Sequence, residues 1–432
     1  MRSLSLSELA GLVGGRLQLA STPPSSGEWA PLGRVVADVR AVRPGDLFWA
    51  LDSEGERTAT CVAEAFRLQA AGAVVAGQRV APWAGKYVLQ VEDAHWALWQ
   101  LATWCRKHYR GCVIAVSGGV GKTTTRHMIN AALAGAMSGT APERGATDRV
   151  GVPLGILELA ETSAYALLEY ASDQPGENLA ISHLCRPGIA VINSLSVRRP
   201  AAGVIELLAG LPETGCAVLN GDHPTLRELV DRTAAEVVLV GRGSHCDLVA
   251  SHVDCRCGEL AFTVAGTRFR LPVWGRHHLH AALAAVAVGQ KLGLPWEALA
   301  ESLATYREPA GRCQVRREQN ITVIDDTYDA RVEALWAALE LLSEMREPGR
   351  RIVVCGEVAG DGDETQCQRQ IGHALVSRGG ADYLVSCGRY SECLVQAARE
   401  AGMPARQTIR CRHPEDVAGT VQALVEIGRA HV

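Results

Sequence analysis

The chain holds 432 residues, which is too long for one ordinary hydrophobic core and predicts two or three domains. Hydrophobic residues make up 47% and charged residues 21%, a composition that excludes a wholly disordered protein. The formal net charge is −4, from 43 basic and 47 acidic side chains. The composition therefore lacks the basic surplus of a nucleic-acid-binding protein.

The sequence contains no recognisable export or membrane segment. Its first residues, MRSLSLSELAGLVGG, lack the apolar stretch of a signal peptide, and no run of about 18 apolar residues occurs elsewhere. We therefore expect a cytoplasmic protein without a membrane span. Fourteen cysteines are scattered along the chain, with Cys255 and Cys257 as a close pair. In a chain without an export signal, this pattern favours free thiols over disulfides or a zinc site.

Short apolar runs separated by turn residues open the chain, among them VVADVR, PGDLFWAL, GAVVAG and YVLQV. They predict strands around one helix at residues 60–71, and hence a small α/β domain over residues 1–110. The spacing of Trp and Leu in residues 94–109 predicts a helix that connects this domain to the next.

A second domain is expected over residues 111–309. It begins with an apolar strand at 112–116, a glycine-rich loop and a helix from 123 to about 134. Alternating polar and apolar residues between 245 and 273 predict an antiparallel hairpin, and a helix is expected at 280–292. Further strands are predicted at residues 165–169, 189–192, 217–219 and 237–240.

A third domain is expected over residues 310–432. Strands at 321–325, 351–355 and 383–386 alternate with helices at 332–345 and 364–378, the spacing of βαβ units. The predicted fold class is therefore α/β with three domains. A small N-terminal α/β domain precedes a central, mostly parallel P-loop-type sheet and a C-terminal Rossmann-like sheet.

The glycine-rich loop, GGVGKTTT at residues 118–125, predicts a phosphate site for ATP. Glycines let backbone N–H groups turn toward an anion, and the helix N-terminus adds partial positive charge. Lys122 would reach the β- and γ-phosphates, and the Thr123 hydroxyl would meet Mg²⁺. The alternative is a glycine-rich turn with a surface lysine, but the order strand, loop, helix favours the phosphate site. The predicted nucleotide-binding residues of the loop are Gly118, Gly119, Gly121, Lys122, Thr123 and Thr124.

The spacing in SGGVGKTTT resembles the ATP loop of the Mur ligases, and other motifs follow in the order of that family. VADVRAVRPGDLFWAL resembles the family's N-terminal uridine-nucleotide motif, and GRHHLHAALAA resembles the join of its second and third domains. DDTYDARVEALWAALELL, at residues 325–342, resembles the branch that adds D-alanyl-D-alanine to a UDP-N-acetylmuramoyl tripeptide. The resemblance covers nearly the whole chain.

The resemblance implies an ATP-dependent amide ligase of peptidoglycan precursor synthesis. In this chemistry ATP phosphorylates a substrate carboxylate, and an amine then attacks the acyl phosphate, so charge neutralisation and alignment are the main requirements. The implied cofactors are ATP and Mg²⁺. The implied small-molecule substrates are a UDP-N-acetylmuramoyl peptide and D-Ala-D-Ala, bound by a monomer that takes no nucleic acid.

The same resemblance implies roles for single residues. Lys122, Glu169 and Arg312 are the expected catalytic residues, and Thr123 and Glu169 the expected Mg²⁺ ligands. Arg312 is expected at the γ-phosphate. The alternatives are a solvated charge at a strand end for Glu169 and a surface salt bridge for Arg312.

Two further residues are expected at the nucleoside. Asp325 is the expected ribose contact, with a surface salt bridge as the alternative, and His277 is expected on the adenine side. The family's pattern H-N-x-x-N is altered here, since His278 and Ala281 stand where it has asparagines.

The metal residues of the family are also altered. Arg198 stands where the family has a metal-binding histidine, and no lysine lies between Lys122 and Lys291 to form the carbamate that would hold a second Mg²⁺. Arginine cannot replace it, because a guanidinium offers no lone pair to a cation. We therefore predict one Mg²⁺, with Glu169 as its only strong protein carboxylate and with Arg198 or Arg199 directed at the phosphates.

Two functions remain open from the sequence. The first is the active ligase. The second is a catalytically impaired relative that binds nucleotide or UDP-sugar and acts as a binding or regulatory partner, which would account for the altered metal ligands. An unrelated P-loop kinase would not explain residues 325–342. By comparison with the family, the C-terminal domain is expected to be truncated, since Val432 precedes its last strand.

Overall fold

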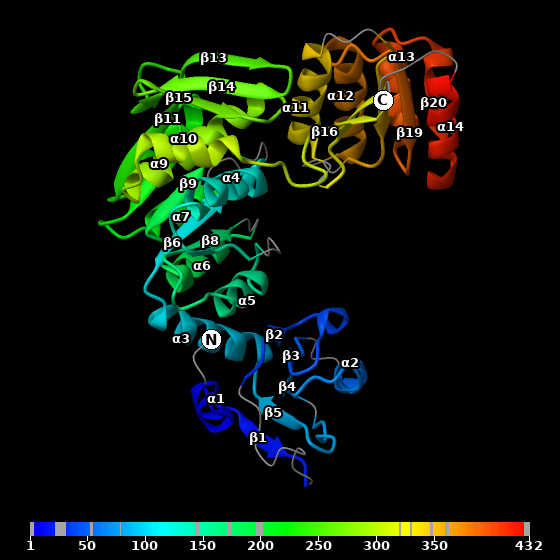
Figure 1. Ribbon diagram of the computed structural model, residues 1–432. Coiled ribbons are helices and arrows are strands. Elements are labelled where there is room, and N and C mark those ends of the chain that lie inside the picture. The colour runs from blue at the N-terminus through cyan, green and yellow to red at the C-terminus, as the bar shows by residue number, and fades with distance from the viewer. Residues whose placement is uncertain are drawn as a thin grey trace.

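The computed structural model of the protein describes residues 4–21, 32–51, 55–77, 79–142, 147–170, 174–195, 202–318, 321–328, 331–345, 349–358 and 363–426. Within these ranges the chain forms five sheets in three successive lobes (Figure 1). The N-terminal sheet lies at one end of the molecule and the C-terminal sheet at the other. The predicted three-domain α/β fold is confirmed. The domain limits near residues 110 and 310 remain a prediction.

The N-terminal sheet has the order β1-β5-β4-β3-β2, with β1 antiparallel to β5 and the other pairs parallel. The predicted helix at 60–71 lies a few residues earlier, because Gln69 takes a left-handed φ of 68° that ends the helical run. The elements of this lobe are α1 (Leu6–Leu12), β1 (Arg16–Leu19), β2 (Val35–Val36), η1 (Val39–Ala41), β3 (Leu47–Trp49), α2 (Gly55–Arg67), β4 (Gly72–Ala76) and β5 (Tyr87–Val91).

Helix α3 (Ala94–His108) connects the first two lobes, as predicted. Asp93 begins it by accepting hydrogen bonds from the backbone N–H groups of His95 and Trp96. Its buried residues, Leu98 and Leu101 among them, belong to one core cluster with residues of both the N-terminal and the central sheet. The two lobes therefore share a hydrophobic core across α3.

The central sheet is wholly parallel, with the order β12-β11-β10-β9-β6-β8-β7. Its middle strands are buried along their whole length, which explains their continuous apolar sequences. The elements are β6 (Cys112–Ser117), α4 (Lys122–Ala134), β7 (Gly139–Thr140), α5 (Gly151–Leu157), β8 (Tyr165–Glu169), α6 (Glu177–Cys185), β9 (Ile189–Ile192), α7 (Ala202–Ala209), β10 (Cys216–Asn220), α8 (Pro224–Arg227), η2 (Val230–Arg232), β11 (Glu236–Gly241) and β12 (Leu248–Val249).

An antiparallel sheet follows where the alternating pattern predicted a hairpin, and it contains three strands. Helix α9 then packs with α4 against the second face of the central sheet, within a separate core cluster. The elements of this part are β13 (Ser251–Arg256), β14 (Glu259–Val264), β15 (Thr267–Leu271), η3 (Arg276–His278), α9 (Leu279–Lys291) and α10 (Trp296–Ala304).

The C-terminal lobe contains the predicted parallel sheet, with the order β18-β19-β20. The predicted strand at 321–325 does not join it. That strand, β17 (Ile321–Asp325), pairs antiparallel with its neighbour in sequence, β16 (Gln314–Glu318), because the shortest connection has the smallest loop-closure cost. The remaining elements are α11 (Val332–Glu344), β18 (Ile352–Cys355), α12 (Glu364–Ser377), β19 (Tyr383–Cys387), α13 (Ser391–Glu400), η4 (Ala405–Gln407), β20 (Thr408–Cys411) and α14 (Pro414–Glu426).

Two further expectations concern the chain as a whole. All fourteen cysteines are free thiols, as predicted. In the part of the chain that the structure describes, every helix is too short or too polar to cross a lipid bilayer.

Candidate functional site

The phosphate loop lies between β6 and α4, and its backbone requires glycine at two positions. Gly118 has a φ of 128° and Gly121 a φ of 78°, where residues with a Cβ are strained. A Cβ on Gly118 would also lie 2.5 Å from the carbonyl oxygen of Ser194. Ser194, which follows β9, fixes the loop: its hydroxyl accepts from Val120 N–H at 2.9 Å, and its carbonyl accepts from Gly119 N–H at 3.2 Å.

Lys122 begins helix α4, as predicted, and its side chain folds over the loop. The Nζ atom donates hydrogen bonds to the carbonyl oxygens of Gly118, at 3.0 Å, and Gly119, at 2.8 Å. The ammonium group and the N-terminal end of α4 therefore place positive charge on the same side of the loop.

Glu169 ends strand β8 beside this loop. Strands β6 and β8 are parallel neighbours in which Glu169 is the partner of Val116, so the carboxylate is placed next to the chain that leaves β6. The Thr123 hydroxyl donates to Oε2 of Glu169 at 3.2 Å. Glu169 is only 5% exposed, so the interpretation as a solvated charge is wrong.

Arg126, which the sequence reasoning missed, holds the other oxygen of Glu169. Its Nε donates to Oε1 at 2.6 Å, and both side chains are almost fully buried. Arg126 lies three residues after Thr123 on α4, so both side chains are on one helical face toward β8. The i, i+3 spacing of Thr123 and Arg126 was visible in the sequence. The spacing alone does not show which strand end lies opposite that face of α4.

Arg312 enters the site from the segment that precedes β16. One Nη2 hydrogen donates to the Thr123 hydroxyl at 3.2 Å, and the guanidinium lies over the Tyr328 ring at 4.2 Å from its centroid. The structure thus brings Lys122, Thr123, Glu169 and Arg312 together, from two domains.

A cavity of about 170 Å³ adjoins the loop and is lined by residues of the central and C-terminal domains, including Gly121, Thr124 and His277. Polar side chains from the ends of β9 and β10 reach its wall. Asn193 donates to the Thr125 hydroxyl at 2.7 Å, and Asn220 donates to the Asn193 carbonyl at 2.9 Å. We refer to this space as the loop cavity.

Histidines form an uncharged wall of the loop cavity. The rings of His277 and His278 lie 4.1 Å apart. Burial lowers the pKa of His278 to about 4, and burial together with His278 lowers the pKa of His277 well below its ordinary value. Glu308, with Oε1 at 3.3 Å from Nε2 of His278, has a pKa raised to about 7 by burial. Neutral imidazoles at this wall suit an uncharged group such as a nucleobase.

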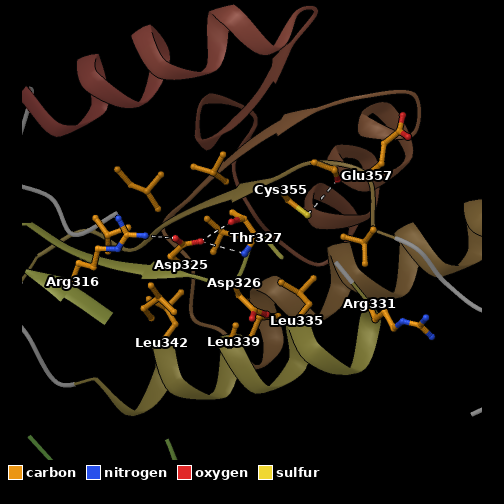
Figure 2. A pocket seen from close by; sticks show the side chains of 18 residues that line it. Arg316, Asp325, Asp326, Thr327, Arg331, Leu335, Leu339, Leu342, Cys355 and Glu357 are labelled. Carbon is orange, nitrogen blue, oxygen red and sulfur yellow. Dashed lines mark hydrogen bonds and ion pairs between the residues drawn. The ribbon is translucent and has the colours of Figure 1, made fainter. Parts of the chain in front are cut away.

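The structure does not bring Asp325 to the loop cavity. Its carboxylate accepts from Arg316 at 2.6 Å and from the Thr327 hydroxyl at 2.7 Å, which fits the alternative of a salt bridge. Figure 2 shows these contacts in a separate cavity of about 640 Å³ between β17, α11 and β18. Asp326, the next residue, lines the loop cavity and accepts from the Cys313 N–H at 3.0 Å, and burial raises its pKa. Asp326 thus lines both cavities, whereas Asp325 lines only the second one.

A larger cavity, of about 940 Å³, lies between the N-terminal and central domains. The motif VADVR contributes to it through Val36, Ala37 and Asp38, and α5 lines its other side. Pro142, whose carbonyl accepts from Nη1 of Arg126 at 3.0 Å, belongs to the same wall.

The fit of the site to a metal can be judged from its oxygen atoms. The Thr123 hydroxyl and the Glu169 carboxylate offer two adjacent oxygen ligands, the donor type that Mg²⁺ prefers, so the residues fit one such ion. The predicted contribution of Arg198 or Arg199 to the phosphates lies outside the described residues.

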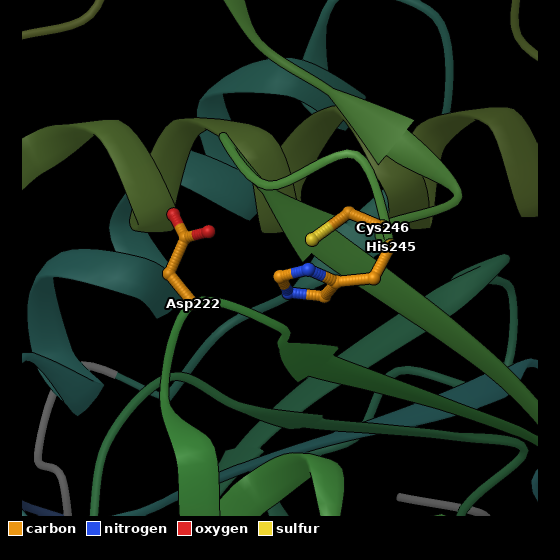
Figure 3. Close-up of side chains that lie close together, drawn as sticks. All are labelled: Asp222, His245 and Cys246. Carbon is orange, nitrogen blue, oxygen red and sulfur yellow. The ribbon is translucent and has the colours of Figure 1, made fainter.

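A second group with metal-ligand atoms, Asp222, His245 and Cys246, has those atoms within 4.8 Å of one another (Figure 3). The Asp222 carboxylate accepts from the backbone of Arg242 and lies 2.9 Å from Nε2 of His280. Because the group is engaged in holding the turn after β11, we interpret it as structural.

Comparison with known proteins identifies the family. Residues 116–289 match the Mur ligase middle domain, and residues 311–431 match the Mur ligase glutamate ligase domain. The UDP-N-acetylmuramoyl-tripeptide--D-alanyl-D-alanine ligase of Mycobacterium tuberculosis (strain H37Rv) is 30% identical over 408 residues, which covers 84% of this chain and 79% of that protein. The chain belongs to the Mur ligase family.

Other relatives extend this comparison. The Escherichia coli K12 protein of the same name is 29% identical over 416 residues, covering 92% of this Mur ligase and 89% of the relative. Crystal structure II of MurF from Acinetobacter baumannii aligns with a TM-score of 0.83 at 22% identity, covering 99% and 94% of the two chains. MurF from Thermotoga maritima in complex with ADP aligns with a TM-score of 0.73 at 23% identity, covering 90% and 91%. These structures share the three-domain fold of this Mur ligase.

Proposed function

We propose that this Mur ligase joins D-alanyl-D-alanine to a UDP-N-acetylmuramoyl tripeptide with ATP, in the cytoplasm, as a step of peptidoglycan precursor synthesis. The observation that carries the proposal is the convergence of Lys122, Thr123, Glu169 and Arg312 at the head of α4. Relatives that carry the ligase name over most of their length support the substrates.

The ATP phosphates would lie against the loop and the N-terminal end of α4. Lys122 would then exchange its bonds to the Gly118 and Gly119 carbonyls for bonds to phosphate oxygens. Thr123 and Glu169 would hold Mg²⁺, which supplies neutralisation of phosphate charge when bound. Arg312, 3.2 Å from the Thr123 hydroxyl, is placed to bind oxygens of the γ-phosphate.

The reaction would proceed in two displacements. A carboxylate oxygen of the tripeptide attacks the γ-phosphorus, and the bond from that phosphorus to the β-phosphate oxygen breaks, which leaves ADP and an acyl phosphate. The amine nitrogen of D-alanyl-D-alanine then attacks the acyl carbon. The bond from carbon to the phosphate oxygen breaks, and the nitrogen loses a proton. The fixed cations of the site act mainly by alignment and charge stabilisation.

The substrates and the nucleoside would occupy different cavities. The uridine nucleotide would occupy the cavity between the N-terminal and central domains, where VADVR lies. The adenine would lie beside the neutral His277 and His278, and Asp326, rather than Asp325, lines the cavity next to the ribose position. All these parts come from one chain, so we propose that the monomer is sufficient.

The test is a ligation assay with the UDP-N-acetylmuramoyl tripeptide, D-Ala-D-Ala and Mg-ATP. We expect phosphate release that requires both substrates, and a product heavier than the tripeptide by the dipeptide less one water. Lys122→Ala is the control for contaminating activity. ATP binding without product would instead support the impaired relative. The relatives described above do not favour that second function, since they are named as ligases.

A further inference from the structure

The Glu169 carboxylate, beside the phosphate loop, has a buried cation in contact with it. The side chains of Arg126 and Glu169 are 4% and 3% exposed, and the distance from Nε to Oε1 is 2.6 Å. The second oxygen, Oε2, accepts from the Thr123 hydroxyl at 3.2 Å. Both oxygens of Glu169 are therefore engaged by side chains of α4.

The guanidinium of Arg126 is held along three edges. Besides Nε, its Nη1 donates to the Pro142 carbonyl at 3.0 Å, and its Nη2 lies 3.2 Å from Nε2 of His127. Burial and the charge of Arg126 lower the pKa of His127, so this imidazole is neutral and accepts the hydrogen bond. An arginine does not lose its proton in a protein. The positive charge beside Glu169 is thus permanent and fixed in place.

We propose that Arg126 is a positioning residue that serves as the built-in counter-ion of Glu169 and weakens the hold of this site on a divalent cation. The inference deepens the proposed function, since it concerns the site assigned to Mg-ATP. A cation that approaches Glu169 meets a carboxylate already neutralised on Oε1, with Oε2 and Thr123 as the remaining oxygens. Like charges in such a poorly solvated site also repel each other.

Arg312 adds to the same effect from the other side. Its guanidinium donates to the Thr123 hydroxyl, so the two oxygen groups that fit a metal lie between two arginines. Fixed guanidiniums would therefore supply part of the phosphate neutralisation that a bound ion would otherwise supply. Nucleotide binding should consequently depend little on the divalent ion.

The experiment measures Mn²⁺ binding to the nucleotide-free protein by the loss of the free-ion electron paramagnetic resonance signal, because a free ATP analogue would itself bind Mn²⁺. The proteins compared are wild type, Arg126→Gln and Arg126→Lys. Arg106→Lys is the matched control, since Arg106 is a part-buried arginine bonded to the carbonyls of Cys185 and Arg186, outside this site. Removing the charge should tighten Mn²⁺ binding by about tenfold or more, and Arg126→Lys should stay within about threefold of wild type.

Unchanged or weaker Mn²⁺ binding by Arg126→Gln would overturn the inference. If Arg126→Gln does not fold, Glu169→Gln takes its place. Loss of a neutralised carboxylate should weaken Mn²⁺ binding by less than about threefold, and a loss beyond about tenfold overturns the inference. Calorimetric titration of a non-hydrolysable ATP analogue at saturating Mg²⁺ separates the two proposals: if wild type does not bind it, the proposed function fails, while the Mn²⁺ titrations still test the counter-ion.

Discussion

Arg312 of the C-terminal domain donates a hydrogen bond to the hydroxyl of Thr123, the second residue of α4, across the boundary between two domains. The guanidinium is held at the same time over the Tyr328 ring. The contact means that the site is complete only when the C-terminal domain is docked on the loop. A planar guanidinium can lie over the ring while its edge donates to the hydroxyl, an arrangement that the ammonium group of lysine does not reproduce.

Arg312→Lys should therefore lower kcat in the ligation assay by about tenfold or more, because it loses a charge-assisted contact of roughly 1.5–3 kcal/mol. The KM values for the two substrates should change less, since they would bind elsewhere. Arg316→Lys is the matched control, because Arg316 lies nearby in sequence, on β16, but pairs with Asp325. Equal losses in the two variants would contradict the assigned position of Arg312.

Lys122→Ala should weaken ATP binding severely. The ammonium is the mobile positive charge of the loop, and a charge-assisted contact contributes roughly 1.5–3 kcal/mol. Calorimetric titration of ATP into wild type and variant measures the difference. Lys107→Ala, in the last turn of α3, serves as the control. Equal affinities of wild type and Lys122→Ala would count against the phosphate site.

Local patterns predicted most of the fold. Helices α3, α4 and α9 lie within one residue of the predicted ends, because their periodicity and the adjacent glycines or caps are encoded locally. The pairing of β17 with β16 was missed because no strand was predicted at residues 314–318, so β17 was expected to join the parallel sheet. The limits of β17 itself were predicted correctly, but the strand alone does not show that Asp326, and not the expected Asp325, lines the loop cavity.

Of the candidate site, the residues of the phosphate loop could be predicted from the sequence, but the contacts between distant residues could not. The loop residues are contiguous, so their spacing was enough. Arg126 was missed because an arginine in an amphipathic helix usually faces solvent, and only the register of β6 against β8 shows that Glu169 meets it. Burial of that pair is a property of the assembled sheet, which no local pattern contains.

Asp326→Asn and Asp325→Asn should differ in their effect on ATP affinity. Asp326 lines the loop cavity, so loss of its charge should weaken binding by about fivefold or more, the range of one hydrogen bond to a polar partner. Asp325→Asn should leave ATP affinity nearly unchanged and instead disturb the contact with Arg316. Fluorescence titration with an ATP analogue measures both. The reverse order of effects would restore Asp325 as the ribose contact.

Glu308 and His278 should make stability depend on pH in opposite directions. The pKa of Glu308 is raised from 4.5 to about 7 by burial, so the folded protein holds an extra proton between these values and loses stability as the pH rises through them. The pKa of His278 is lowered from 6.5 to about 4 by burial, so its contribution to stability grows as the pH rises from 4 to 6.5. Between 4.5 and 6.5 the two contributions oppose each other.

Replacing Glu308 by Gln removes the pH-dependent contribution of Glu308 to stability and leaves that of His278. The free energy of unfolding of Glu308→Gln relative to wild type should increase from pH 4.5 to 7, by up to about 1.4 kcal/mol per pH unit. Urea unfolding at a series of pH values measures it. Glu301→Gln, at an exposed position of α10, is the control and should follow wild type. A flat difference would show that Glu308 keeps its ordinary pKa.

Gly118→Ala and Gly121→Ala form a matched pair that tests the shape of the phosphate loop. Both glycines have positive φ, so an alanine at either position is strained by about 1–3 kcal/mol. At Gly121 a Cβ meets nothing within 4 Å, whereas at Gly118 it would lie 2.5 Å from the carbonyl of Ser194, which also accepts the Gly119 N–H. Backbone cannot yield as a side chain does, so Gly118→Ala must displace the loop. We expect Gly118→Ala to lower both the free energy of unfolding and ATP affinity by more than Gly121→Ala does, as measured by urea unfolding and calorimetric titration. If the two variants bound ATP alike, the contact between the loop and the end of β9 would not determine the phosphate site.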